Sequence, residues 1–462
     1  MGSRPQGAEA LEYLKPLPRS QRPYSLRSFT WMMFSMNTCI PMFFLGAIAY
    51  KLGIGLWEAI GIALLGNLAT VIVMILNGLP GYRYGIPYPI QARAAFGSKG
   101  YLVPVVLRAI VGAGWYGIEA YNACLALLFI ALLALGVPAP QITSTAVRLV
   151  LPVLAGYIVL ATLVTMKGLK GIGVVAEYGG PLLLLYFAWL LAYIVLGGRG
   201  SSLITSTAAS ASFTALLTYL AVQTNWWATV ALNISDLTRG VDSPVTLIVA
   251  PLLGIVGGQV LGTFIGYELV ALTGKWLPQE IVLLAPTIPA IVLGEIFCFL
   301  APFSTDVTAN IPPVLDLTVG VTRRWSLAVI LACAIGFIVA PWWAVEKGPD
   351  IVSYVTAFAS NYGVLLGPIA GILLADYYIV RRGRYNLEEI YNGGVGFNWA
   401  ALGSLVASIA LCYAVSIALN QTVHVGLLVF PSPLSWYIGL ASGLVIYTIA
   451  SLASYRRRLQ PS

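Results

Sequence analysis

Long apolar stretches separated by short polar segments run along the whole chain. Twelve of them have the length of a membrane span, at about 28–50, 55–78, 101–134, 146–166, 171–196, 211–235, 244–272, 282–310, 325–345, 352–380, 397–417 and 430–454. A spanning α-helix needs about 20 mostly apolar residues, whereas a transmembrane strand would show alternating segments of about ten residues. The pattern therefore predicts an all-α polytopic membrane protein with twelve transmembrane helices.

Polar residues interrupt two of the predicted helices in mid-membrane. The stretch "FSMNTCIP" (34–41) places Asn37, Thr38 and Pro41 in the first helix, where proline removes a backbone donor. The stretch "AVQTNWW" (221–227) places polar side chains at a similar depth in the sixth. Two broken helices five spans apart are typical of an inverted five-plus-five repeat with the substrate near the midplane. A proline kink and a polar helix–helix contact remain the alternative for either one alone.

The repeat divides the chain into four parts. We expect a cytoplasmic tail at 1–26, a first repeat of helices 1–5 at 27–200 and a second repeat of helices 6–10 at 201–385. Two further helices and a second tail follow at 386–462.

The charge pattern sets the expected orientation. Only 9% of the residues are charged, and nineteen of the 25 Lys and Arg residues fall in the tails and on one set of alternating loops. The positive-inside rule then places both termini in the cytoplasm of a multi-pass protein in the plasma membrane. The net charge of +8 is spread over short loops, which argues against a nucleic-acid partner.

Few residues suit metal or disulfide chemistry. The five cysteines lie in apolar stretches without paired spacing, which is typical of small buried side chains. His424 is the only histidine, and this argues against a histidine-based metal site or proton relay. The chain has no GxxxxGK[ST], HExxH or GxGD motif, so neither an ATPase domain nor a common intramembrane protease is expected.

The third predicted helix contains an unusual carboxylate. Glu119 is the only charged residue between Arg108 and Arg148, and such a group costs roughly 2.5–3.5 kcal/mol at the centre of a spanning helix. Trp115 lies four residues earlier, on the same face. An indole next to a carboxylate suits a flat ring whose N–H groups need an acceptor. The alternative is a packing Trp and a Glu paired with a cation elsewhere.

The eighth predicted helix ends in the polar stretch "LAPFSTDVTAN" (300–310). Ser304 and Thr305 supply adjacent hydroxyls, Asp306 a second intramembrane carboxylate, and Asn310 an amide one turn later. Small hard cations prefer such oxygen ligands, although hydroxyls alone are weak support because they also bond within their own helix.

With these residues in view, the chain resembles the nucleobase–cation symporter type 1 family. The stretches that carry the resemblance are "GIPYPIQARAAFG" (85–97), "WYGIE" (115–119), "STDVTAN" (304–310) and "GPIAGILLADYYIVRR" (367–382). The resemblance implies the five-plus-five fold, alternating access, and uptake of a planar nitrogen heterocycle or ureide together with a cation. It implies that the co-transported ion is sodium, and we expect a monomer in the lipid bilayer.

The resemblance also implies site residues. The substrate would be held between Trp115 and Trp227, with Trp226 as the adjacent competitor, and would bond to Glu119 and Asn310, with Thr38 and Asp306 completing the set. Sodium would bind the carbonyls of Phe34, Asn37 and Ala301 and the hydroxyls of Ser304 and Thr305.

Three departures from the family pattern change the expected site. Glu119 replaces an amide, Asp306 stands in place of an asparagine, and Trp226 replaces a glycine beside the stacking Trp. We therefore expect a smaller and more acidic pocket that suits cytosine, a purine or allantoin better than a bulky aryl-hydantoin. A protonated carboxyl would instead suit uracil.

The coupling ion and the class of protein have alternatives. Proton coupling through Glu119 or Asp306 is the alternative to sodium, and the retained hydroxyls of Ser304 and Thr305 favour sodium. A channel or a membrane-embedded enzyme is disfavoured, because no filter-like repeated loop and no nucleophile–base pair is visible. The chain is therefore predicted to be a transporter and not an enzyme.

Overall fold

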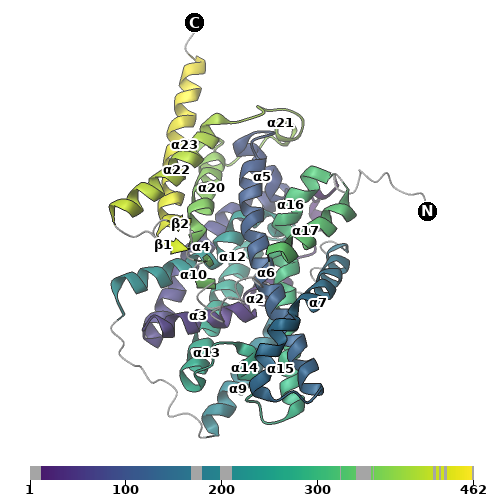
Figure 1. Cartoon of the computed structure of the whole chain (residues 1–462). Coiled ribbons are helices and arrows are strands. Elements are labelled where there is room, and N and C mark those ends of the chain that lie inside the picture. Colours follow the sequence, from purple (N-terminus) through teal and green to yellow (C-terminus); the bar gives the residue numbers. More distant parts are fainter. Residues whose placement is uncertain are drawn as a thin grey trace, which may run out of the picture.

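The computed structural model of the chain describes residues 12–167, 179–197, 211–322, 324–339, 355–356, 358–359, 361–419, 423–425, 428–430 and 434–459. Helices make up most of it and cross the molecule side by side (Figure 1). The long elements are α4 (Leu56–Tyr84), α6 (Leu102–Ala134), α7 (Ala139–Thr165), α9 (Gly179–Leu196), α10 (Phe213–Asn233), α13 (Gly258–Thr273), α15 (Ile288–Thr305), α17 (Trp325–Val339), α22 (Trp399–Ala418) and α23 (Ser435–Leu459).

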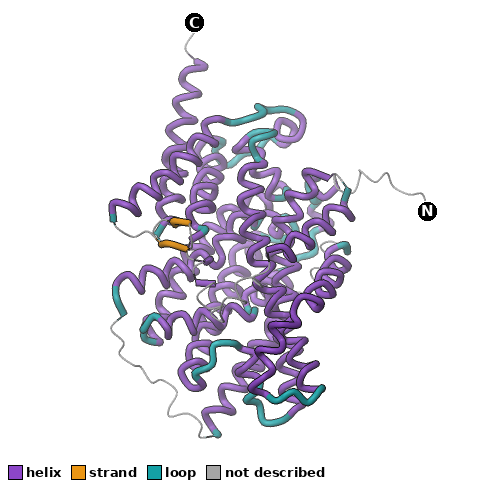
Figure 2. Tube along the Cα trace, viewed as in Figure 1, coloured by secondary structure: helices purple, strands orange, loops and turns teal. Residues whose placement is uncertain are grey.

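Shorter helices break or join these long ones. They are η1 (Arg19–Gln21), α2 (Leu26–Asn37), α3 (Ile40–Lys51), α5 (Tyr88–Phe96), α11 (Ser235–Thr238), α12 (Pro244–Pro251), η2 (Leu252–Gly257), α14 (Pro278–Val282), η3 (Asp306–Asn310), α16 (Ile311–Thr322), α20 (Gly363–Leu374), η4 (Ala375–Val380) and α21 (Leu387–Asn392). Three of them, η2, η3 and η4, are π-helical turns inside longer helices. A two-stranded antiparallel hairpin, β1 (Val423–Val425) with β2 (Leu428–Phe430), is drawn in orange in Figure 2.

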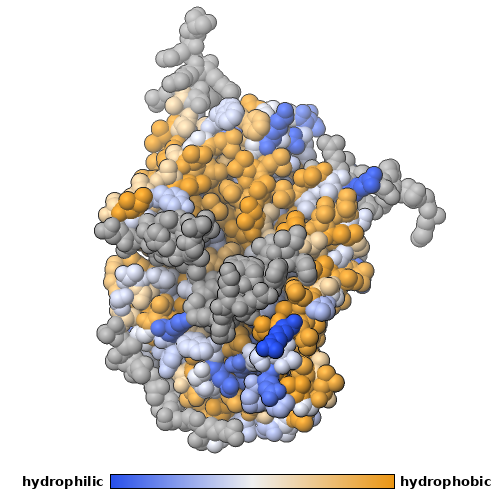
Figure 3. Space-filling view, in the orientation of Figure 1, coloured by the Kyte–Doolittle hydropathy of each residue, from blue (hydrophilic) through white to orange (hydrophobic). Residues whose placement is uncertain are grey.

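The all-helical polytopic architecture predicted from the apolar pattern is confirmed. In the described part of the chain, eight helices are long and apolar enough to cross a membrane, and α2 with α3 form a ninth span bent by 54°. The fifth, sixth and ninth predicted spans correspond to α9, α10 and α17. Figure 3 shows apolar surface over much of the face in view, with hydrophilic residues gathered near its upper and lower ends.

The break in the first predicted helix is present where the sequence places it. α2 ends at Asn37 and α3 begins at Ile40, so Thr38 and Cys39 have non-helical backbone. Pro41 lies in the first turn of α3, where its missing N–H costs nothing. The break leaves the end of α2 in the protein interior, against η2 and α15.

The predicted interruption at 221–227 is not found. α10 is continuous from Phe213 to Asn233, and a single turn residue, Ile234, separates it from α11. The polar side chains of this stretch form hydrogen bonds with side chains of neighbouring helices, so the helix does not unwind. Gln223 accepts hydrogen bonds from Asn67 of α4 at 3.2 Å and from Gln259 of α13 at 3.0 Å. This expectation was wrong because a polar helix–helix contact removes the need for a break.

Close packing of α3 against α13 depends on a glycine. A Cβ on Gly46 would lie 2.1 Å from the Tyr267 nitrogen and 2.5 Å from the Gly266 carbonyl carbon, both of which are backbone atoms that cannot rotate away. Gly46→Ala is therefore expected to destabilise the protein by about 1–3 kcal/mol, as overpacked cores do. Thermal unfolding of the purified protein should show a lower midpoint. Gly61→Ala in α4, where a Cβ meets nothing within 4 Å, is the matched control, and equal midpoints for the two variants would contradict this account.

Candidate substrate and cation site

A small cavity lies at the centre of the helix bundle, next to the break between α2 and α3. Its volume is about 20 Å³, which holds no more than about one water molecule. The residues that line it are Met36, Cys39, Trp115, Glu119, Trp226, Trp227, Thr229, Val230, Thr305, Ala309 and Asn310. Six of the residues singled out in the sequence are among them, and they come from α6, α10, α15 and η3.

Two indole rings close this cavity against each other. The ring centroids of Trp115 and Trp226 are 4.6 Å apart, with the planes inclined by 60°. Trp115 is held in place by its indole N–H, which donates to the Tyr362 hydroxyl at 3.2 Å. Because the rings touch, a planar ligand can enter between them only if they move apart. Of the two indoles of α10, the one that contacts Trp115 is Trp226, which the sequence analysis treated as the competitor.

Trp227 lines the same cavity but has a second contact. Its indole N–H donates to the side-chain oxygen of Asn37 at 2.9 Å and to that of Gln259 at 3.1 Å. The amide nitrogen of Asn37 in turn donates to the Ile255 carbonyl at 2.8 Å. Trp227 therefore connects α10 to the end of α2 and to α13, which contains Gln259.

Glu119 points into the cavity from the third predicted helix. Its side chain is 2% exposed, and it lies one turn beyond Trp115 on the same face of α6. The Cys39 thiol at the helix break is hydrogen-bonded to the carboxyl group. The Oε2 atom of Glu119 has no hydrogen-bond partner in the described chain. That oxygen is available as an acceptor for a ligand N–H group.

Asp306 and Thr38 lie outside the cavity lining. The Tyr157 hydroxyl donates to Asp306 Oδ2 at 2.5 Å, and the Asn310 amide donates to Oδ1 at 2.9 Å. Asp306 thus orients the amide of Asn310, which does line the cavity. The Thr38 hydroxyl donates to the Phe34 carbonyl at 3.0 Å and so closes the last turn of α2.

The residues proposed for sodium gather where α2 ends against α15. The Thr305 hydroxyl donates to the Met36 carbonyl at 3.0 Å and to the Ala301 carbonyl at 3.2 Å. The hydroxyls of Ser304 and Ser35 are 3.3 Å apart. The carbonyls of Phe34 and Asn37 belong to the same last turn of α2. Thr305 belongs to this group of oxygen atoms and also lines the small central cavity.

Arg108 is hydrogen-bonded to two residues that line the cavity, Thr229 and Ala309. It is 1% exposed, and its guanidinium donates to the Thr229 carbonyl at 2.7 Å, to Asn233 Oδ1 at 2.9 Å and to the Ala309 carbonyl at 3.3 Å. The Ala309 carbonyl is free to accept because Pro313 has no N–H to offer it in the following turn. Arg108 therefore joins α6, α10 and η3 directly next to the cavity lining.

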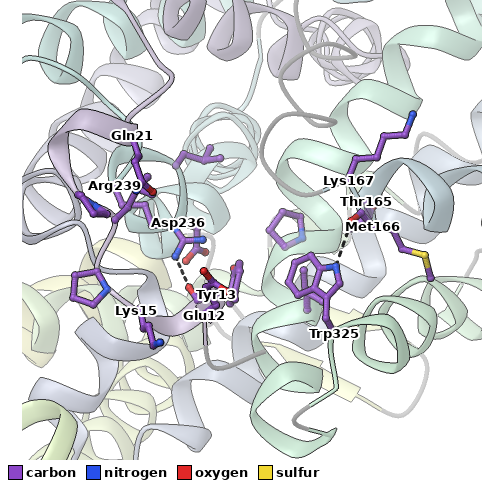
Figure 4. Close-up of a pocket in the computed structure, with 16 residues that line it drawn as sticks. Glu12, Tyr13, Lys15, Gln21, Thr165, Met166, Lys167, Asp236, Arg239 and Trp325 are labelled. Carbon is purple, nitrogen blue, oxygen red and sulfur yellow. Dashed lines mark hydrogen bonds between the residues drawn. The ribbon is translucent and has the colours of Figure 1, made fainter. Parts of the chain in front are cut away.

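A larger cavity of about 740 Å³ lies beyond Arg108, on the side of the molecule that carries residues 12–21. We call this the tail side. Figure 4 shows the segment from Glu12 to Gln21 on one side of this cavity and Trp325 with Thr165–Lys167 on the other. Asp236, Leu237, Pro312 and Leu315 line its inner part, one to two turns beyond the Arg108 contacts on α10 and η3.

Tyr13 anchors the N-terminal segment across this larger cavity. Its hydroxyl donates to Asp316 at 2.8 Å, its carbonyl accepts from Arg239 at 2.6 Å, and the Arg239 guanidinium lies 4.6 Å from its ring centroid. Burial, and then the nearby carboxylate of Asp316, raise the pKa of the Tyr13 phenol, so the phenol keeps its proton and remains a donor.

A family model for permeases of cytosine and purines, uracil, thiamine and allantoin matches residues 16–439. The chain belongs to this permease family. The nucleobase–cation symporter family inferred from the four sequence stretches is therefore confirmed, and the protein is a transporter and not an enzyme.

The permease resembles relatives that are named for different compounds, one of which is clearly longer than this chain. It is 30% identical to the purine-uracil permease of Arabidopsis thaliana, over 86% of this chain and 69% of that protein. It is 26% identical to the hydantoin permease of Microbacterium maritypicum, over 86% of this chain and 82% of that protein. Mhp1, a nucleobase-cation-symport-1 transporter solved closed around bromovinylhydantoin, has the same fold, with a TM-score of 0.79, 22% identity and 96% coverage of both chains.

Several residues around the permease's cavity were not anticipated from the sequence. Met36, Cys39 and Thr229 lie within or beside the stretches already singled out, and a helical-face argument on either side of the break would have included them. Arg108 was not singled out as a site residue, because its three acceptors belong to residues more than 120 positions away.

Proposed function

We propose that this permease is a sodium-coupled symporter that imports a nucleobase or a related planar nitrogen heterocycle or ureide by alternating access. The observation that carries the proposal is the position of Thr305. Its hydroxyl lies among the oxygen atoms at the end of α2, and the same residue lines the cavity beside Glu119 and Asn310. An ion bound there and a ligand in the cavity would touch the same residue, so each would favour the other's binding.

The proposed roles follow from the side chains that reach the cavity. The heterocycle lies between the rings of Trp115 and Trp226, and its N–H edge bonds to Glu119 and Asn310. Trp227, Thr38 and Asp306 hold these groups in place. The carbonyls of Phe34, Asn37 and Ala301 and the hydroxyls of Ser304 and Thr305 supply the oxygen ligands that a small hard cation prefers.

We further propose that the tail side faces the cytoplasm and that the protein is a monomer in the plasma membrane. The excess of Lys and Arg on that set of loops supports the orientation. Release to the cytoplasm then requires the bonds from Arg108 to the Thr229 and Ala309 carbonyls to open, since they lie between the two cavities.

Binding to the purified permease tests the proposal. Thermal shift is measured for uracil, cytosine, adenine, guanine, hypoxanthine, allantoin and hydantoin, each in sodium and in choline. We expect at least one compound to stabilise the protein more in sodium. If a compound binds equally in both salts but varies with pH, a proton replaces sodium as the coupling ion. If no compound binds, the substrate class is wrong.

Removal of the two hydroxyls should uncouple the ion from the ligand. Ser304→Ala with Thr305→Ala is expected to reduce the tightening of ligand by sodium to less than about twofold, because coupling between two sites is typically worth about 1–3 kcal/mol and is lost with one site. Thr287→Ala, at the far end of the same helix, is the control. Unchanged tightening in the double variant would exclude these hydroxyls as sodium ligands.

A further inference from the structure

Glu295 is a buried carboxyl group that the proposed transport site does not use. It lies in α15, its side chain is fully buried, and neither of its two oxygens has a hydrogen-bond partner in the described chain. Glu119 and Asp306, the other two carboxyls considered for the site, each have at least one partner. An isolated carboxylate inside a membrane protein is expensive, and such residues normally mark a functional site.

The position of Glu295 separates it from the substrate and sodium residues. It precedes Ser304 by nine residues on the same helix, which is roughly 13 Å at 1.5 Å per residue. It follows the start of α15 at Ile288 by seven residues, or roughly 10 Å. Because α15 continues through η3 towards the tail side, Glu295 lies between the sodium residues and the opposite side of the molecule.

The surroundings of Glu295 contain no counter-charge. The titratable groups that interact electrostatically with Glu295 are the phenol of Tyr186 in α9 and the thiol of Cys298, one turn further along α15. The Tyr186 hydroxyl is already used, since it donates to the Ala290 carbonyl at 2.9 Å. In the described chain no cation pairs with Glu295 from α2, α3, α6, α9 or α14, which pack against α15. The single cation of α3, Lys51, lies 6.0 Å from the centroid of the Trp276 ring.

These neighbours decide which ion the site takes. A phenol and a thiol are poor ligands for a hard cation, which needs several oxygen atoms around it. A proton needs a single carboxylate oxygen, and it removes the charge that makes burial costly. We propose that Glu295 is a proton-binding site, distinct from the substrate cavity and the sodium residues, whose proton is exchanged during the transport cycle.

The packing of α15, which contains Glu295, against α9 connects the proton-binding site to the sodium residues. α9 and α15 pack together, and Gly294 lies so close to the Tyr186 ring that a Cβ there would be 2.3 Å from it. At the other end of the same pair, the Gly180 N–H donates to Ser35, which contacts Ser304. A movement of α9 against α15 that alters the sodium residues therefore also alters the surroundings of Glu295.

Infrared spectroscopy of the purified permease tests proton binding without any knowledge of the substrate. The C=O stretch of a protonated carboxylic acid, shifted in D₂O, should be present in the native protein and weaker in Glu295→Gln. Glu58→Gln, an exposed residue at the start of α4, should leave it unchanged. If Glu295→Gln leaves the band intact, Glu295 does not bind the proton and the proposal fails, whatever the substrate proves to be.

Proton movement in proteoliposomes tests the exchange, which rests on the proposed transport function. With a pH dye trapped inside and a binder from the panel of heterocycles added outside, we expect uptake to carry protons in the native protein. Glu295→Asp should retain this flux, and Glu295→Gln should lose it while binding the compound within about threefold of the native affinity. Proton flux that persists in Glu295→Gln, or uptake without proton movement in the native protein, would overturn the proposed exchange.

Discussion

Glu119→Gln is expected to reorder the heterocycles that the permease binds, with only a small effect on its stability. When it is ionised, the Glu119 carboxylate only accepts hydrogen bonds, and its Oε2 atom has no partner in the described chain. An amide offers one acceptor and one donor. Hydrogen bonds to a charged group contribute about 1.5–3 kcal/mol, so ligands with two adjacent N–H donors should lose about 10- to 100-fold in affinity. Ligands that present a carbonyl next to an N–H group should lose less affinity or gain affinity.

Competition binding at fixed sodium measures this change. Cytosine, adenine and allantoin are compared with uracil and hypoxanthine, in the native protein and in Glu119→Gln. Glu58→Gln serves as the control for the loss of a carboxylate outside the cavity. A uniform loss for all ligands would mean that Glu119 supports the cavity without reading the ligand. An unchanged order in a folded variant would remove Glu119 from the binding site.

Local sequence information was sufficient for the spans and the first break. Helices that cross a membrane must be long and apolar in themselves, so each can be recognised without knowledge of its neighbours. Pro41 acts on its own preceding turn, and the break at Thr38 and Cys39 follows directly. Trp115 and Glu119 were placed on one face by their spacing alone, and both line the cavity.

The parts that depend on distant partners could not be predicted in the same way. The stretch 221–227 reads as a break because its polar groups have no local partners, yet Asn67 and Gln259 supply them from α4 and α13. The orientation of Trp226 and Trp227 depends on which neighbour each indole meets, Trp115 or Asn37. The family resemblance favoured Trp227 as the stacking ring and left Trp226 as the adjacent competitor, because a resemblance in sequence does not fix which of two adjacent rings meets Trp115.

From the contact between the two indoles we expect Trp226 to select ligands by size. In the closed cavity Trp226 occupies space beside Trp115 and leaves about 20 Å³, whereas ligand sites usually have about 300–1,000 Å³. A small planar base can insert between the rings of Trp115 and Trp226 when the two rings move apart. A ligand with a bulky substituent also needs the volume of the Trp226 side chain, which the native protein cannot vacate.

Trp226→Ala is therefore expected to admit ligands that the native permease rejects and to weaken those it prefers. An aryl-substituted hydantoin should stabilise the variant and not the native protein. Small bases should lose roughly 10-fold or more in affinity, since stacking on an aromatic side chain is worth about 1–3 kcal/mol per base. Thermal shift and competition binding with both ligand classes measure the two effects.

Trp227→Phe distinguishes the role of Trp227 from that of Trp226. It keeps an aromatic ring at the cavity and removes the N–H that donates to Asn37 and Gln259. If Trp226 sets the size limit, this variant should keep the native preference for small ligands and lose part of the sodium effect, because the end of α2 is less firmly held. If Trp227→Phe changes the size preference and Trp226→Ala does not, the stacking role belongs to Trp227, and the contact between Trp115 and Trp226 serves only to close the empty cavity.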